Sequence, residues 1–315
     1  MRARARAPSP AEARAERDVA AVELAAVIVA VTGDEARVLT LEEGKALPSG
    51  PLESGHRTLQ TGLRSWVERQ THHPLGYIEQ LYTFADRDRG PSGRVISICY
   101  LGLTREAQAS GDHDARWRGW YRYFPWEDWR AGPPPALQQV ILPRLHGWAD
   151  GTGESALKRE RRQRIEVTFA ESDRGWNEDL VLQRYELLYE AGLLPEAGSD
   201  RPAAPGEPMI YDHRRILATG IARLRAKIKY RPVVFELMPP SFTLLQLQRA
   251  VEALAGRRLH KQNFRRLIDQ QGLVEPTSGV STETGGRPAK LFRFRRDVLQ
   301  ERAAAGTKLP LYRPG

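Results

Sequence analysis

The order of helix and strand signals over residues 242–295 constrains the fold more than any other feature of this sequence. Thr243 and Gln246 fit the S/T-x-x-E/Q capping box, in which each side chain hydrogen-bonds to the other residue's backbone N–H. This box predicts a helix that starts after Thr243. Gly256 predicts its end, because glycine readily adopts the left-handed conformation of a helix C-cap.

The residues after Gly256 predict a second helix and then a hairpin. Residues 260–271 have apolar side chains at helical spacing. Residues 273–275 and 289–295 have strand character, and 276–286 form the tip between them. A capped helix, a short turn, a basic helix and a basic hairpin in this order predict a winged helix-turn-helix.

The second helix has the composition of a DNA-recognition helix. Phe264, Leu267 and Ile268 form its apolar face. Gln262, Arg265 and Arg266 point elsewhere, and we expect them to read bases because arginine pairs with guanine and glutamine with adenine. An ordinary solvent-exposed helix is the alternative, but such a helix normally mixes both signs of charge. Here only Asp269 opposes the cations.

Other side chains in this region are expected to contact the phosphate backbone, because cations neutralise phosphates without reading sequence. These are Lys261 on the helix, and Arg287 and Lys290 at the base of the hairpin tip. Thr243 and Asn263 complete the predicted DNA-binding set.

The charge distribution supports this expectation. Residues 209–315 hold 21 Lys and Arg against 8 Asp and Glu, a net charge of +13. The first 208 residues hold 27 against 31, a net charge of −4. A basic surplus can serve solubility alone, but such an uneven division favours a polyanionic partner, double-stranded DNA, for the C-terminal part.

Two more elements are predicted at the start of the C-terminal half. Residues 213–230 read as a helix capped by Asp212, with Arg225 on a polar face away from Leu217 and Leu224. Residues 233–237 read as a short strand. A proline-rich stretch over 198–208 predicts the linker, so the expected division is a disordered tail (1–19), a first domain (20–197), the linker and a DNA-binding domain (209–315).

The first domain reads as α/β. Strands are expected over 25–31, 36–41, 77–84 and 94–103, with a turn at 32–35, a loop over 48–55 and a helix over 58–70. The segment 117–130 is rich in aromatic residues; we favour core packing for it, with a base-stacking platform as the alternative. It begins a helical insert that extends to residue 197. The fold class is therefore α+β.

The loop and helix after Gly50 match the Nudix box, G-x5-E-x7-R-E-U-x-E-E-x-G-U, at Gly50, Arg64 and Glu68. At the other conserved acidic positions the sequence has His56, Ser65 and Arg69. Nudix hydrolases hold divalent metal with these glutamates, and one carboxylate is too few for Mg²⁺. The sequence therefore predicts no metal and no catalysis. Arg57, Arg64 and Arg69 are expected to bind a diphosphate directly, beside Glu68.

Several classes of site are excluded by composition. Cys99 is the one cysteine, so an intrachain disulfide is impossible, and the seven histidines lack the spacing of a zinc site. No apolar run approaches the ~20 residues of a membrane span. We expect a cytoplasmic protein.

A degenerate Nudix domain followed by a winged helix resembles the Nudix-related transcriptional regulators of NAD metabolism and, among them, is most similar to the alphaproteobacterial NadQ group. The stretches that carry this resemblance are Asp212–Leu217, Arg223–Tyr230, Phe242–Leu244, Leu247–Gln248, Asn263–Arg266, Gly286–Ala289 and Leu291–Phe292. The resemblance implies a homodimeric repressor of NAD biosynthesis genes that binds a palindromic operator. It also implies that NAD, ADP-ribose or ATP acts as an effector, without a required cofactor.

Two other functions remain open from the residues themselves. One is a Nudix-type hydrolase of a nucleoside diphosphate derivative with a DNA-binding tail. The other is a constitutive DNA- or RNA-binding protein whose N-terminal half only dimerises.

Overall fold

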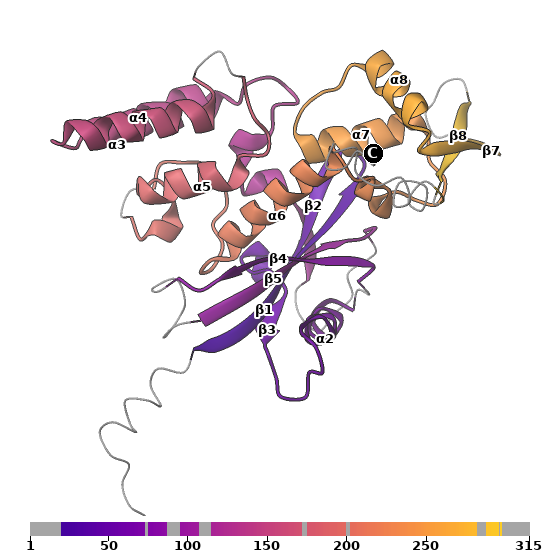
Figure 1. Cartoon of the computed structure of the whole chain (residues 1–315), viewed down its shortest axis with the longest axis horizontal. Coiled ribbons are helices and arrows are strands. Elements are labelled where there is room, and N and C mark those ends of the chain that lie inside the picture. Colours follow the sequence, from indigo (N-terminus) through magenta and orange to yellow (C-terminus); the bar gives the residue numbers. More distant parts are fainter. Residues whose placement is uncertain are drawn as a thin grey trace, which may run out of the picture.

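The computed structural model describes residues 20–72, 75–86, 95–106, 115–171, 175–199, 202–281, 288–295 and 297. The predicted tail over 1–19 lies outside these residues. A mixed sheet, a group of helices and a small helix–hairpin domain make up the described chain (Figure 1). The expected α/β sheet domain and the C-terminal order of two helices and a hairpin are both present.

The sheet is built around β1 (Ala21–Thr32), whose residues 24–30 are at most 1% exposed. β1 pairs in parallel with β5 (Val95–Leu103) and antiparallel with β2 (Glu35–Thr40) and β3 (Ser49–Pro51). β4 (Tyr77–Phe84) extends the sheet beyond β5, and β6 (Arg116–Gly119) extends it beyond β2. The strand order is β4-β5-β1-β2-β6, with β3 also on β1.

Strand β3 was not predicted, because its three residues lie in the expected Gly- and Pro-rich loop. The register explains why it forms. β2 pairs only with residues 29–32 of β1, so Glu23–Ala25 keep free backbone groups on the same side, and β3 satisfies them. The predicted hairpin between β1 and β2 is confirmed, with Gly33 at φ +61° in its turn.

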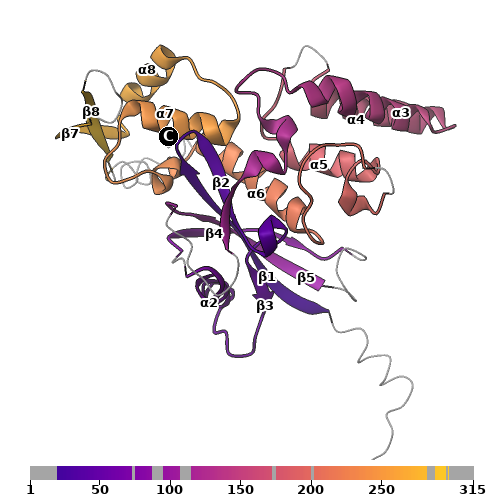
Figure 2. The same cartoon turned by 180° about the vertical axis from the view of Figure 1, so that it is seen from behind.

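Each face of β1 is covered by a helix. Leu24, Ala26 and Ile28 pack against α2 (Leu59–Thr71). The alternate residues of β1 face a larger core to which α6 (His213–Ile228) contributes. Figures 1 and 2 show α2 on one side of the sheet and α6 on the other.

Helix α6 joins the parts of the molecule, since it contacts β1, β4, β5, α5 and α7. A Cβ on Gly220 would lie 2.8 Å from Val27, so glycine permits this close packing. The prediction that Asp212 caps α6 is wrong: its side chain makes no capping hydrogen bond and lies 3.6 Å from Arg215. Arg225, which was placed on a polar face, is fully buried.

The insert begins with the aromatic segment and continues as helices. It comprises the 3-10 turns η3 (Trp120–Arg122) and η4 (Pro125–Glu127), the π turn η5 (Leu137–Ile141), α3 (Leu142–Asp150), α4 (Ser155–Phe169), α5 (Val181–Glu190) and η6 (Pro195–Ala197). Trp120, Tyr123, Phe124 and Trp126 have no exposed surface. The core-packing interpretation of the aromatic segment is therefore confirmed.

The helix–hairpin domain consists of α7 (Leu244–Ala255), α8 (Lys261–Gln271), β7 (Val274–Ser281) and β8 (Ala289–Phe294). The strand predicted over 233–237 is wrong: this segment is the 3-10 helix η7 (Val233–Leu237). Val233, Val234, Phe235 and Leu237 are buried and only Glu236 is exposed, so this short apolar segment fits a buried strand equally well. β7 also runs into the predicted tip, with a register shift between Pro276 and Val280.

Candidate nucleic-acid interface and nucleotide site

Helix α8 presents an exposed cationic face. Phe264 and Ile268 are each 8% exposed and anchor the helix. The exposed set comprises Lys261, Gln262, Asn263, Arg265 and Arg266. Among the described residues, no carboxylate lies within ion-pairing distance of Lys261, Arg265 or Arg266. Their charges are therefore available to phosphates and base edges.

Leu267 departs from the predicted apolar face, since it is 51% exposed. The buried anchors Phe264 and Ile268 are four residues apart, and Leu267 lies at the margin of their stripe. It lines a pocket of about 210 Å³ between the end of α6, α7 and α8, beside the 63% exposed Tyr230.

The predicted capping box of α7 is confirmed. The Thr243 hydroxyl accepts from the Gln246 N–H at 3.1 Å, and the Gln246 side-chain oxygen accepts from the Thr243 N–H at 2.7 Å. Thr243 is only 3% exposed, so its side chain serves the helix start and not an exposed DNA-binding surface.

Glu252 fixes the turn between α7 and α8. Its carboxylate accepts from the Leu259 N–H at 2.9 Å, from Gln248 at 2.8 Å and from Arg258 at 2.8 Å. Burial opposes ionisation of Glu252, but these hydrogen bonds outweigh it and hold the pKa of Glu252 below its usual value. The charged carboxylate thus sets where α8 begins relative to α7.

Of the two predicted hairpin contacts, the structure describes Lys290. Lys290 on β8 is exposed, opposite Val280 of β7, and its Nζ lies 6.0 Å from the centre of the Phe292 ring. Arg287, the other predicted hairpin contact, lies outside the described residues. Phe242 and Phe292 exchange backbone hydrogen bonds of 2.9 and 2.8 Å, which ties the hairpin to the start of α7.

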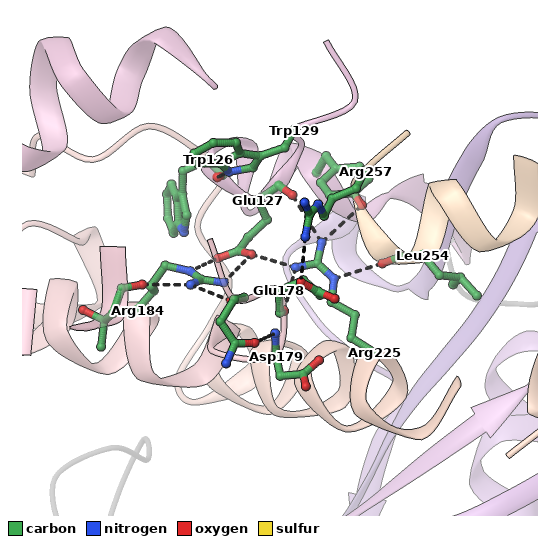
Figure 3. Close-up of polar contacts among 12 residues, drawn as sticks. Trp126, Glu127, Trp129, Glu178, Asp179, Arg184, Arg225, Leu254 and Arg257 are labelled. Atoms are coloured by element: carbon green, nitrogen blue, oxygen red, sulfur yellow. Dashed lines mark hydrogen bonds and ion pairs between the residues drawn. The ribbon is translucent and has the colours of Figure 1, made fainter. Parts of the chain in front are cut away.

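A buried ionic cluster supports the end of α7 (Figure 3). Glu127 receives two hydrogen bonds from Arg184 at 2.6 and 2.9 Å, and one from Arg225 at 2.7 Å. All three side chains are at most 1% exposed. Arg225 also donates to the Leu254 carbonyl at 2.9 Å, so the cluster connects the insert, α6 and α7.

Sequence reasoning missed this cluster because it placed Arg225 on a solvent face. One signal could have found it. Glu127 directly follows the buried aromatic residues Phe124 and Trp126, and a carboxylate in such surroundings requires a buried cation.

The predicted nucleotide-binding residues lie on and before α2, but they do not form one cluster. Arg57, Glu68 and Arg69 are exposed. The Arg69 guanidinium lies 4.5 Å from the centre of the Trp66 ring. Arg64 instead donates to two backbone carbonyls, those of Leu75 and Gly76, the latter at 3.2 Å.

Other positions of the motif also have structural roles. His56 Nδ1 accepts from the Glu53 N–H at 3.1 Å, and its ring packs so closely on Gly62 that a Cβ there would lie 2.7 Å away. The Trp66 indole donates to the Pro51 carbonyl at 2.9 Å and covers Gly50. The described residues contain no group of three or more His, Cys, Asp or Glu side chains that could hold a metal ion. Of the described helices, none has the length and apolar character needed to cross a bilayer.

Comparison with known proteins agrees with this geometry. Residues 234–294 match the family model described as the NrtR DNA-binding winged helix domain. The ADPR responsive transcriptional repressor NtrR of Acinetobacter baylyi is 42% identical over 86 residues, 27% of this chain. The match spans about a third of that relative, 34% of its length.

Two solved structures share the fold of nearly the whole chain. NrtR of Shewanella oneidensis, solved with a 27mer DNA, has a TM-score of 0.55 at 19% identity and covers 89% of this chain and 95% of its own. A MutT/nudix family protein from Enterococcus faecalis has a TM-score of 0.52 at 14% identity and covers 91% and 94%. The likeness therefore extends over both domains.

Proposed function

We propose that this chain, whose C-terminal domain is an NrtR-type winged helix, is a ligand-responsive transcriptional repressor of NAD biosynthesis genes. The observation that carries the proposal is the face of α8, where Lys261, Arg265 and Arg266 lie exposed without acidic partners among the described residues. Cations kept unpaired beside Gln262 match what a major-groove helix requires.

The N-terminal domain acts in this proposal as a non-catalytic sensor of an adenine nucleotide. Its fold is Nudix-like, and the Acinetobacter baylyi relative is named as responsive to ADPR. ADP-ribose is therefore the first effector to test, with NAD and ATP as the other candidates. A charged diphosphate suits Arg57 and Arg69, both exposed at the motif.

The remaining properties follow from the same proposal. A repressor of this kind acts in the cytoplasm, where the chromosome is, and needs no cofactor. A homodimer would bind a palindromic operator, since two-fold symmetry in a protein is mirrored in its half-sites. Membership of the NadQ group stays a prediction.

A gel shift tests the proposal directly. The DNA is the region upstream of NAD biosynthesis genes from the source genome, and the salt concentration is fixed because phosphate-driven affinity falls steeply as salt rises. NAD, ADP-ribose and ATP are added separately. A specific shift that one nucleotide alters supports the repressor, whereas binding that no nucleotide alters supports a constitutive DNA-binding protein.

A Nudix-type hydrolase is the second candidate, and the Nudix-like fold is what favours it. Glu68 is the one glutamate of the motif that remains on α2. We expect no Mg²⁺-dependent turnover of ADP-ribose, because one carboxylate does not fix the metal that this reaction requires. Sustained turnover with Mg²⁺ would establish the hydrolase.

A further inference from the structure

A series of polar contacts, joined by short stretches of backbone, connects the Nudix motif to the end of α7, and it begins at Arg64. The guanidinium reaches from α2 across to the Leu75 and Gly76 carbonyls, just before β4. Arg64 is only partly buried. A diphosphate bound at the motif competes for these same N–H donors, because a charged acceptor forms a stronger hydrogen bond than a carbonyl.

Strand β4 carries the next contact. Tyr77 and Glu79 lie one and three residues after Gly76, and both bond the ammonium group of Lys227 on α6. The Tyr77 hydroxyl is 2.9 Å from Lys227 Nζ. Burial opposes the charge of Lys227, but the bonds to Glu79 and Tyr77 outweigh it and raise the pKa of Lys227. The ammonium group therefore stays charged and holds α6 to the start of β4.

Helix α6 links the contact at β4 to the contacts on the opposite side of the helix. Arg225 is two residues from Lys227, and residues at that spacing point to nearly opposite sides of a helix. Lys227 faces β4, whereas Arg225 faces Glu127 and the Leu254 carbonyl. A displacement of α6 at Lys227 must therefore move Arg225 as well, since both belong to one rigid helix.

Arg225 meets the last turn of α7 together with two other donors from outside the winged helix. The Tyr121 hydroxyl donates to the Ala253 carbonyl at 2.7 Å, and the Trp129 N–H donates to the Gly256 carbonyl at 2.8 Å. Donors at a helix C-terminus satisfy its free carbonyls and set its position. The turn to α8 begins at Gly256, so this position also sets the orientation of α8.

We propose that nucleotide occupancy is transmitted to the DNA-binding helices through Arg64, the start of β4 and Lys227 of α6. Arg64 is the switch, bonded either to the Leu75 and Gly76 carbonyls or to the bound diphosphate. Lys227 is a positioning residue, because it touches neither ligand nor DNA. This inference rests on the proposed function, since it assigns a route between the two sites that the function requires.

The test compares Lys227→Met with Lys229→Met. Lys229 lies two residues after Lys227, at the C-cap of α6, and pairs with Glu178 and Asp179 of the insert, not with β4. The affinity for operator DNA is measured with and without ADP-ribose, and the ratio of the two Kd values gives the coupling. We expect this ratio to fall to within about twofold of unity in Lys227→Met, a loss of the 5–150-fold coupling typical of allosteric proteins. Lys229→Met and the conservative Lys227→Arg should retain the wild-type ratio.

Hydrogen exchange supplies a readout that needs no effector. Lys227→Met should increase amide exchange over residues 253–272, whereas Lys229→Met should not. Retained coupling in Lys227→Met, or equal exchange in the two variants, overturns the inference. A wild-type protein whose DNA affinity no nucleotide alters refutes the proposed sensor instead, and the exchange comparison then decides whether the mechanical connection exists.

Discussion

Arg225 on α6 donates a hydrogen bond from Nε to the carbonyl oxygen of Leu254 at the end of α7, over 2.9 Å. The same guanidinium bonds Glu127 of the insert. The support of a DNA-binding helix pair is therefore a buried ion cluster formed by parts of the chain far apart in sequence. Its energetic role can be measured through the carboxylate that both arginines share.

Glu127→Gln should destabilise the protein by about 3–5 kcal/mol, because it leaves two buried guanidinium groups without their counter-charge. The measurement is the free energy of unfolding in urea. Glu207→Gln is the control, since Glu207 forms partly exposed pairs with Arg118 and Arg122 whose loss costs less than about 1 kcal/mol. Equal losses in the two variants would show that the cluster gives no special stability.

Arg266→Ala should weaken operator binding by ~1–3 kcal/mol and relax the preference at one base pair, because we assign Arg266 to base readout. Lys261→Ala should weaken all sequences alike and lower the salt dependence by about one counterion. Binding to a randomised operator library at several salt concentrations distinguishes these effects. A uniform loss in Arg266→Ala would mean that Arg266 contacts phosphate. Lys158→Ala on the distant α4 serves as the control.

Arg69→Glu should abolish nucleotide binding, because it replaces a cation expected to meet the diphosphate with an anion. Isothermal titration with ADP-ribose measures the effect. Arg162→Glu, which removes an exposed ion pair to Asp150 on the insert, should bind as the wild type does. If Arg69→Glu binds ADP-ribose with unchanged affinity, the nucleotide does not bind at Arg69.

Stability should fall in mild acid because of His213. Burial lowers its pKa from 6.5 to about 4, and its Nδ1 accepts from the Leu47 N–H at 2.8 Å, so the folded state holds the neutral ring. The unfolded chain binds a proton below pH 6.5, and the folded chain does so only below about pH 4. The contribution of neutral His213 to the stability of the fold is thus fully present above pH 6.5 and is lost as pH falls towards 4.

The free energy of unfolding should fall by about 2 kcal/mol between pH 7 and pH 5 because of His213. Urea unfolding at the two pH values measures it. His213→Gln retains an acceptor for Leu47 but cannot titrate, so its stability should change less over this interval. A variant that loses as much stability as the wild type would assign the effect to other groups.

Local signals in the sequence were sufficient for the winged helix and for much of the sheet. The capping box at Thr243 and Gln246 and the hairpin turn at Gly33 depend on neighbouring residues, so they could be found without the tertiary structure. The loss of the metal-binding glutamates could likewise be read from His56, Ser65 and Arg69. Local patterns failed over 233–237, where a short segment with four apolar residues fits a strand as well as a 3-10 helix.

The sequence by itself determined the elements of the winged helix, most strands of the sheet and the charges that α8 presents, because helix caps, turns and amphipathic spacing act over a few residues. Only the tertiary structure decided what Arg64, Lys227 and Arg225 do. Arg64 bonds the Leu75 carbonyl. Lys227 bonds Glu79, which is 148 residues away, and Arg225 bonds Glu127, which is 98 residues away. A charged side chain placed by periodicity alone reads as solvent-exposed, and only the packing of distant elements reveals the buried carboxylate or carbonyl that stabilises it.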